Sequence, residues 1–61
     1  MIVELHIECD NAAFELYPEN EVARILHELA DQVERYGIQR YNLRDVNGYE
    51  VGYFQIEREN I

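Results

Sequence analysis

The sequence predicts an α+β fold in which one amphipathic helix packs on a three-stranded antiparallel sheet, in the chain order βαββ. Three observations predict it: apolar and polar residues alternate over residues 2–9, apolar residues recur at helical spacing over residues 22–36, and Asn47-Gly48 separates two further strand-like segments. Sixty-one residues suffice for one core, and no Pro-, Gly- or Ser-rich linker divides them. We therefore expect residues 1–61 to fold as a single domain.

The first strand is expected from residue 2 to residue 9. Its inner face should carry the apolar residues of the alternation, Val3, Leu5, Ile7 and Cys9, and its outer face the polar ones, Glu4, His6, Glu8 and Asp10. A connection over residues 10–17 follows, which Phe14, Leu16 and Tyr17 should anchor as apolar contacts.

The helix should begin at Pro18, because proline suits the first helical position, and end at Gly37. The stripe expected to face the sheet consists of Val22, Ile25, Leu26, Leu29, Val33 and Tyr36. The opposite, solvent-facing side carries charged residues, Glu21, Arg24, Glu28, Asp31 and Arg35, of which Arg24 with Glu28 and Asp31 with Arg35 are spaced to pair.

The Asn47-Gly48 pair predicts a two-residue type I′ turn between strands over residues 38–46 and 49–58. The register of this turn places Val46 opposite Tyr49, Arg44 opposite Val51, Leu43 opposite Gly52 and Tyr41 opposite Phe54. The helix should then cover Tyr41, Leu43, Phe54 and Ile56. Tyr49, Val51 and Tyr53 should lie on the uncovered face with Arg40 and Arg44, and Tyr and Arg are frequent at binding hot spots. If the third strand lies between the other two, in the order 1-3-2, every pairing is antiparallel.

The charge balance limits the class of partner. Thirteen Asp and Glu against five Arg and no Lys give a formal net charge of −8. Nucleic acids and anionic membranes attract basic surfaces, so neither is expected as a direct partner, and no apolar run approaches the length of a membrane span. A basic protein surface is the expected partner. The lone Cys9, with no leader-like N-terminus, indicates a cytoplasmic setting.

Motifs for catalysis, metals and cofactors are nearly absent. Glu4, His6 and Glu8 alternate along one strand face, but same-face neighbours lie roughly 6.6–6.8 Å apart, which is wide for the ligands of one ion. Cys9 should be a small buried hydrophobe rather than a nucleophile. No Gly-rich phosphate loop exists, and one small core leaves little room for a cleft. We therefore expect no enzymatic activity, no metal and no cofactor.

The chain contains two runs, DNAAFELYPENEVARILHELADQVE and LRDVNGYEVGYF, that resemble a family of short proteins carried by bacteriophages and prophages. That family shares DNAAF, a Pro-started helix of the EVARIL type, and LRD-hydrophobic-NGN-xVG, so the resemblance covers residues 10–54. The chain departs from the pattern at Tyr17, where Asn or Asp is usual, and at Tyr49, where a small polar residue is usual. The resemblance implies a phage setting. Phage proteins of this size and acidity are often inhibitors of host defence, anti-CRISPR proteins among them, and several of these are similar to DNA in surface charge.

Two functions are consistent with these observations. In the first, the chain inhibits a nucleic-acid-binding host defence complex of the CRISPR-Cas type by occupying its DNA-binding surface, with a carboxylate cluster near one end of the fold: Glu4, Glu8, Asp10, Glu15, Glu19 and Glu21. In the second, it is a homo-oligomeric phage accessory or structural protein, expected as a dimer, that associates through the uncovered face with Tyr49 and Tyr53. Carboxylates that cluster in space would favour the first function. Carboxylates that are spread evenly over the surface and paired with arginines would favour the second.

Overall fold

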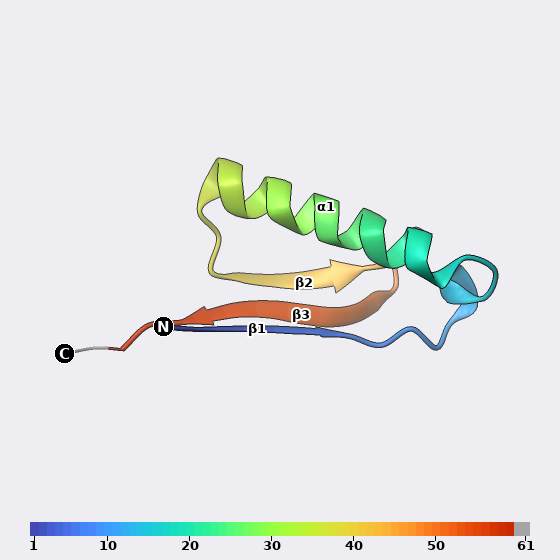
Figure 1. Cartoon of the computed structure of the whole chain (residues 1–61), viewed down its shortest axis with the longest axis horizontal. Coiled ribbons are helices and arrows are strands. Elements are labelled where there is room, and N and C mark those ends of the chain that lie inside the picture. Colours follow the sequence, from blue (N-terminus) through green and yellow to red (C-terminus); the bar gives the residue numbers. More distant parts are fainter. Residues whose placement is uncertain (60–61) are drawn as a thin grey trace.

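The elements follow one another as βαββ in a computed structural model that describes residues 1–59 (Figure 1). They are β1 (Ile2–Ile7), the 3₁₀ turn η1 (Ala12–Phe14), α1 (Pro18–Tyr36), β2 (Arg40–Arg44) and β3 (Glu50–Glu57). β3 lies between β1 and β2 and runs antiparallel to both, so the predicted α+β fold and strand order are confirmed. Residues 60 and 61 of the predicted domain lie outside the described residues.

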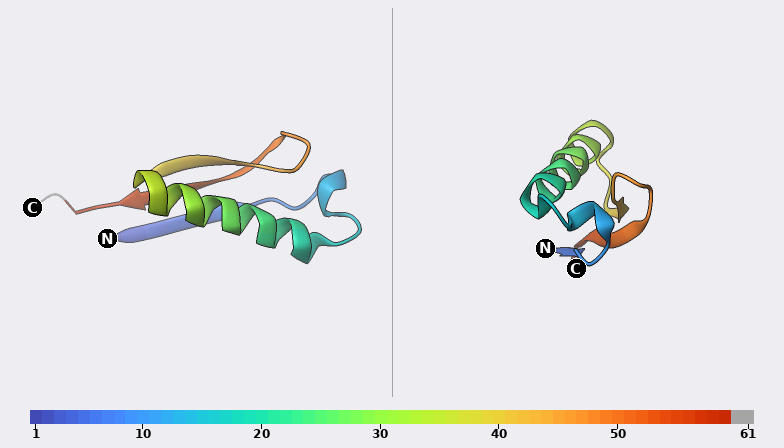
Figure 2. Two further views of the ribbon diagram at one scale, coloured as in Figure 1. Left: turned by 90° about the horizontal axis from the view of Figure 1, so that it is seen from above. Right: turned by 90° about the vertical axis from the view of Figure 1, so that its right-hand side faces the viewer.

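α1 covers one side of the sheet (Figure 2). Its ends are those predicted: Pro18 opens the first turn, and Gly37 ends the helix in the left-handed conformation at φ 60°, donating its N–H to the Val33 carbonyl at 2.9 Å. Ile25 and Leu29 are buried against the sheet, whereas Leu26 and Tyr36 of the predicted stripe are exposed. α1 packs along β2, so the buried stripe is narrower than its apolar residues predict.

The core consists of buried apolar side chains from each layer, Phe14, Ile25, Leu29, Leu43, Val51 and Phe54. Phe14 reaches the core because η1 packs against α1. The η1 turn is held by a hydrogen bond in which the Phe14 N–H donates to the Asn11 carbonyl at 3.0 Å. The predicted anchor role of Phe14 is thus confirmed. Leu16 and Tyr17 are exposed, so their predicted anchor roles are wrong.

The hairpin keeps part of its predicted register, with Leu43 opposite Gly52 and Tyr41 opposite Phe54. The predicted type I′ turn is wrong. Such a turn needs positive φ at both central positions, but among the described turn residues only Gly48 has it, at 89°. The Asp45 N–H donates to the Tyr49 carbonyl at 2.9 Å, so the loop contains the three residues between them, with Gly48 last.

This longer loop changes which side chains face the helix. Arg44 lies opposite Glu50 rather than Val51, because the register shifts between Leu43 and Arg44. Val51 is the extra residue of the resulting bulge, and it turns into the core instead of lying on the uncovered face as predicted.

β1 is shorter than the sequence predicts and is incompletely covered. It ends at Ile7, and Cys9 is exposed rather than buried, because the chain has left the sheet by that point. Val3 and Leu5 do lie opposite Ile56 and Phe54, on the helix side as predicted, yet both remain about half exposed. β1 is an edge strand, and α1 packs along the opposite edge.

Candidate acidic interface

One end of the molecule is formed by the connection after β1, by η1 and by the first turn of α1, opposite the N-terminus (Figure 1). This segment carries four exposed carboxylates, Glu8, Asp10, Glu15 and Glu19, which we call the acidic end. The first Arg of the chain is Arg24, and residues 1–23 contain no Lys. Four of the six predicted site carboxylates therefore occupy one segment that contains no Arg or Lys.

Glu4 lies outside the acidic end. It sits within β1 on the uncovered face, where its Oε2 accepts a hydrogen bond from Gln55 Nε2 at 3.1 Å. Glu8 is the first carboxylate of the acidic end along the chain, and its Oε1 lies 3.3 Å from His6 Nε2.

Glu21 is buried, with 7% of its surface exposed, so the prediction that it faces solvent is wrong. Its Oε1 lies 2.7 Å from Arg24 Nε, and its Oε2 accepts the main-chain N–H of Val46 at 2.7 Å. The N–H of Val46 belongs to the hairpin loop and has no strand partner. A carboxylate in the first turn of α1 satisfies it, which is why this residue is drawn inward.

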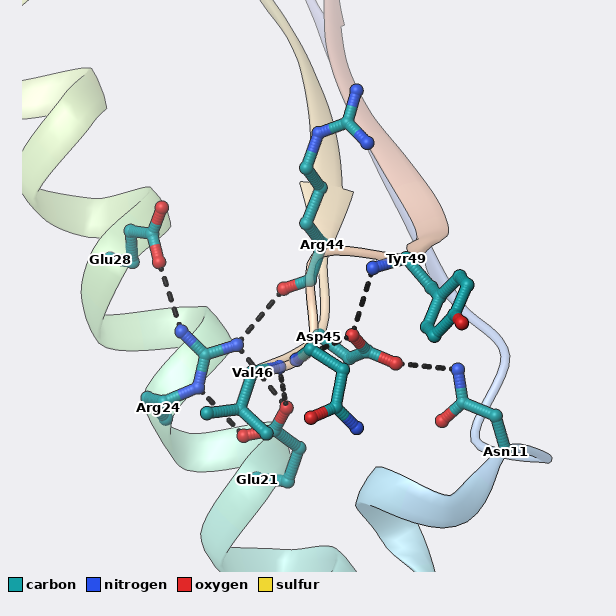
Figure 3. Close-up of polar contacts among 9 residues, drawn as sticks. Asn11, Glu21, Arg24, Glu28, Arg44, Asp45, Val46 and Tyr49 are labelled. Carbon is teal, nitrogen blue, oxygen red and sulfur yellow. Dashed lines mark hydrogen bonds and ion pairs between the residues drawn. The ribbon is translucent and has the colours of Figure 1, made fainter.

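Polar contacts join α1, the β2–β3 hairpin and the connection after β1 in one network (Figure 3). Arg24 bonds Glu21 and also donates to Glu28 Oε2 at 3.1 Å and to the Arg44 carbonyl at 2.9 Å. The guanidinium therefore ties α1 to the end of β2, and the predicted Arg24–Glu28 pair is confirmed. The predicted Asp31–Arg35 pair is also present, at 2.8 Å.

Asp45 is the second buried carboxylate of the network, and our sequence analysis did not single it out. Its Oδ1 accepts the N–H groups of Asn47 and Tyr49, each at 2.9 Å, and its Oδ2 accepts Asn11 Nδ2 at 2.6 Å. The carboxylate therefore shapes the hairpin loop and holds the connection that bears Asp10. The sequence does contain a signal for this role, because Asp45 stands two residues before Asn47-Gly48. An Asp side chain often accepts a hydrogen bond from the main-chain N–H two residues further along the chain.

The pKa values follow this geometry. The hydrogen bond from Arg24 lowers the pKa of Glu21 below its ordinary value of 4.5; the Val46 N–H and the charge of Arg24 act in the same direction, and burial opposes them. The same hydrogen bond raises the pKa of Arg24. Glu21 and Arg24 are therefore both charged at neutral pH. Because their charges oppose each other, Glu21 adds little to the negative field of the acidic end.

The uncovered face carries few apolar side chains. His6 stacks on Tyr53, with ring centroids 5.7 Å apart and planes at 21°, and Gln55 Nε2 bonds Glu4 and Glu57. Tyr53 is 43% exposed. Tyr49 is also exposed but lies at the hairpin loop, away from Tyr53 in the middle of the sheet, so the structure does not bring the two predicted tyrosines together.

Within residues 1–59, no three His, Cys, Asp or Glu side chains are grouped so that they could hold a metal ion. In the same residues, no helix combines the length and the apolar character needed to cross a membrane.

The fold and surface together define a small acidic α+β domain. No protein-family model, curated protein or solved structure matches the chain.

Proposed function

We propose that this chain is a binding protein, not an enzyme, and that it inhibits a nucleic-acid-binding protein by occupying the basic surface that otherwise holds DNA. The observation that carries the proposal is the acidic end: four exposed carboxylates on one segment with no Arg or Lys in the first 23 residues. The arginines of α1, by contrast, are paired with carboxylates within the helix. The acidic end is therefore a stretch of surface whose carboxylates have no basic residue in their own segment, whereas α1 offsets part of its negative charge with arginine.

Electrostatics explains how such a surface finds its target. Opposite charges steer two proteins together over about a Debye length, roughly 8–10 Å at physiological ionic strength, and a nucleic-acid-binding groove is a strongly basic target. The network of Glu21, Arg24 and Asp45 fixes the hairpin, η1 and α1 relative to one another. The carboxylates are therefore presented on a fixed backbone, which reduces the ordering cost of binding.

The DNAAF, EVARIL and NG-containing runs support a phage setting. In that setting the proposed target is a host defence complex of the CRISPR-Cas type, and the site of action is the host cytoplasm. Tyr49, exposed at the hairpin loop, would add an aromatic contact beside the charged surface.

The experiment is capture followed by competition. The tagged chain is used to capture proteins from host cells that carry the defence system, and each captured protein is assayed for DNA binding with and without the chain. The proposal requires that DNA and the chain exclude each other from the same protein. A captured protein that binds both at once would contradict it.

The second candidate function is a homo-oligomeric phage accessory protein that associates through the uncovered face. Tyr53, partly exposed and stacked on His6, favours it. The burial of Val51 removes one of the apolar residues on which the prediction of that interface depended. Sedimentation tests it: a dimer that Tyr53→Glu dissociates would support this function over inhibition.

A further inference from the structure

Among the described residues 1–59, no strand pairs with the outer edge of β1. β3 pairs with one side of β1 along its whole length, from Ile2 to Ile7. The Glu8 N–H donates toward β3, to the Val51 carbonyl at 2.7 Å, and successive residues of a strand point their N–H and C=O groups in opposite directions. The main-chain groups of Val3, Leu5 and Ile7 therefore point away from β3, toward the open edge.

Apart from the charge of Glu4, β1 has few of the features that usually block pairing with another strand. Native edge strands are protected by Lys, Pro, bulges or a covering element. The other edge, β2, carries Arg40 and Arg44, contains the register shift and packs against α1. β1 has no Lys, Arg or Pro and keeps a regular register throughout.

Exposed apolar side chains lie beside the edge on its helix side. Val3 is 54% exposed and Leu5 46% exposed, although their partners across the sheet, Ile56 and Phe54, belong to the core region. A strand added to β1 would extend the sheet on that side, and its own helix-side side chains would lie beside Val3 and Leu5.

α1 contributes to the same apolar strip. Arg24 donates to the Arg44 carbonyl, and Glu28 accepts the Tyr41 hydroxyl at 3.2 Å, so both helical residues face β2. Leu26 lies two residues after Arg24 and two before Glu28, and a step of two residues turns about 200° around the helix axis. It is therefore on the flank turned away from β2, toward the β1 side, where it is 39% exposed.

A second copy of β1 matches this surface in one register. When two β1 strands run antiparallel about a two-fold axis at Leu5, Val3 lies opposite the partner's Ile7, and Glu4 opposite the partner's His6. The apolar residues then share the helix side, the Glu-His pairs share the other side, and the open main-chain groups meet each other. An axis at Glu4 or at His6 would instead place Glu4 opposite the partner's Glu4 or Glu8, and like charges directly opposite are unfavourable.

We propose that the chain forms a two-fold dimer in which the β1 strands pair antiparallel about Leu5. The two sheets become one continuous sheet with both helices on the same face, and the side chains of Val3 and Leu5 gain apolar neighbours from the partner strand on that face, where Leu26 also lies. Because the axis reverses the direction of β1, the two acidic ends lie at opposite ends of the dimer. This assembly does not depend on the proposed function and uses a different surface from the uncovered face.

Sedimentation velocity at micromolar concentration tests the dimer. Leu5→Pro removes an N–H that β3 does not use, and proline is tolerated on edge strands, so this variant should sediment as a folded monomer. Tyr53→Glu, on the uncovered face, is the matched control and should remain dimeric. Circular dichroism confirms folding in each case.

A charge exchange tests the register independently of the proline variant. His6→Glu places carboxylates opposite each other on both sides of the axis and should weaken the dimer about tenfold. The double variant Glu4→His/His6→Glu again places a Glu opposite a His, which can donate a hydrogen bond to the carboxylate, and should recover most of that loss. A native chain that is monomeric at its highest soluble concentration would overturn the proposal, as would a folded Leu5→Pro dimer, dissociation by Tyr53→Glu, or a double variant no tighter than His6→Glu.

Discussion

The Glu21 carboxylate accepts the main-chain N–H of Val46 at 2.7 Å, so the first turn of α1 closes the loop of the β2–β3 hairpin. The same carboxylate is held by Arg24, whose guanidinium also reaches the carbonyl of Arg44. A residue that the helical pattern assigns to the solvent side is thus a structural link between helix and sheet.

Replacement of Glu21 measures this link. Glu21→Ala leaves the Val46 N–H without its acceptor and Arg24 without its main partner, and should lower the free energy of unfolding by about 1–3 kcal/mol. Glu19→Ala is the matched control, because Glu19 is also acidic and in the first turn but is exposed; its loss should stay within about 0.3–1 kcal/mol. Urea unfolding followed by circular dichroism gives both values. Equal losses would show that the Val46 contact contributes little.

Acid should weaken the fold through the same residue. The pKa of Glu21 is lowered in the folded state from an ordinary value of 4.5, so its contribution to stability is complete above that value and is lost as pH falls through the folded pKa. The melting temperature should therefore fall as the pH drops below about 4.5, and Glu21→Gln should make that fall shallower. Melting curves from neutral pH to about pH 3 test this. Identical pH dependence in the two proteins would contradict it.

Two glycines should differ in what they tolerate. A Cβ at Gly52 would run into the main-chain oxygen of His6, so Gly52→Ala should force β1 from β3 and cost about 1–3 kcal/mol or more. Gly37 has no atom near the position of such a Cβ, and Gly37→Ala should cost only the left-handed backbone penalty of roughly 1–2 kcal/mol. Hydrogen exchange separates them: β1 amides should lose protection selectively in Gly52→Ala. Equal protection in both variants would argue against the close approach.

Metal removal should not affect stability. No cluster of three metal-ligating side chains exists among residues 1–59, and His6 lies against Glu8 at 3.3 Å. Dialysis against a chelator should leave the melting temperature unchanged. A metal that binds only the folded state would stabilise it, so a drop of several degrees on chelation would reveal one and would point first to His6 with Glu4 or Glu8.

Much of the fold follows from local patterns in the sequence. Pro18, Gly37 and the apolar spacing between them predict the helix. Alternation and the Asn47-Gly48 pair predict the strands, and the order 1-3-2 is the one that makes every pairing antiparallel. The hairpin loop was predicted incorrectly because Asn-Gly favours a type I′ turn only when no neighbouring side chain stabilises a different loop conformation. The Asp45 carboxylate, bonded to the Asn47 and Tyr49 N–H groups, stabilises a longer loop, which in turn moves Val51 into the core.

The candidate site was harder to predict. The prediction groups Glu8, Asp10, Glu15 and Glu19 with Glu4 and Glu21, and these four do follow one another along the segment at one end of the fold. Glu21 is buried because α1 and the hairpin loop, which are distant in sequence, lie close together in the fold. Helical periodicity carries no information about that contact. The exposure of Val3 and Leu5 likewise depends on which strand α1 packs against.

The proposed inhibition requires that the acidic end compete with nucleic acid for a basic surface. The direct measurement is DNA binding by the captured target, titrated with the native chain, with Glu15→Arg/Glu19→Arg, and with Glu57→Arg/Glu59→Arg. The two variants change net charge equally, but residues 57–59 lie near the other end of the molecule (Figure 1). Reversal at Glu15 and Glu19 should weaken inhibition about tenfold or more, reversal at Glu57 and Glu59 much less, and inhibition by the native chain should fall as salt is added. Equal inhibition by all three proteins, or equal binding of the chain to the DNA-bound target, would contradict the claim.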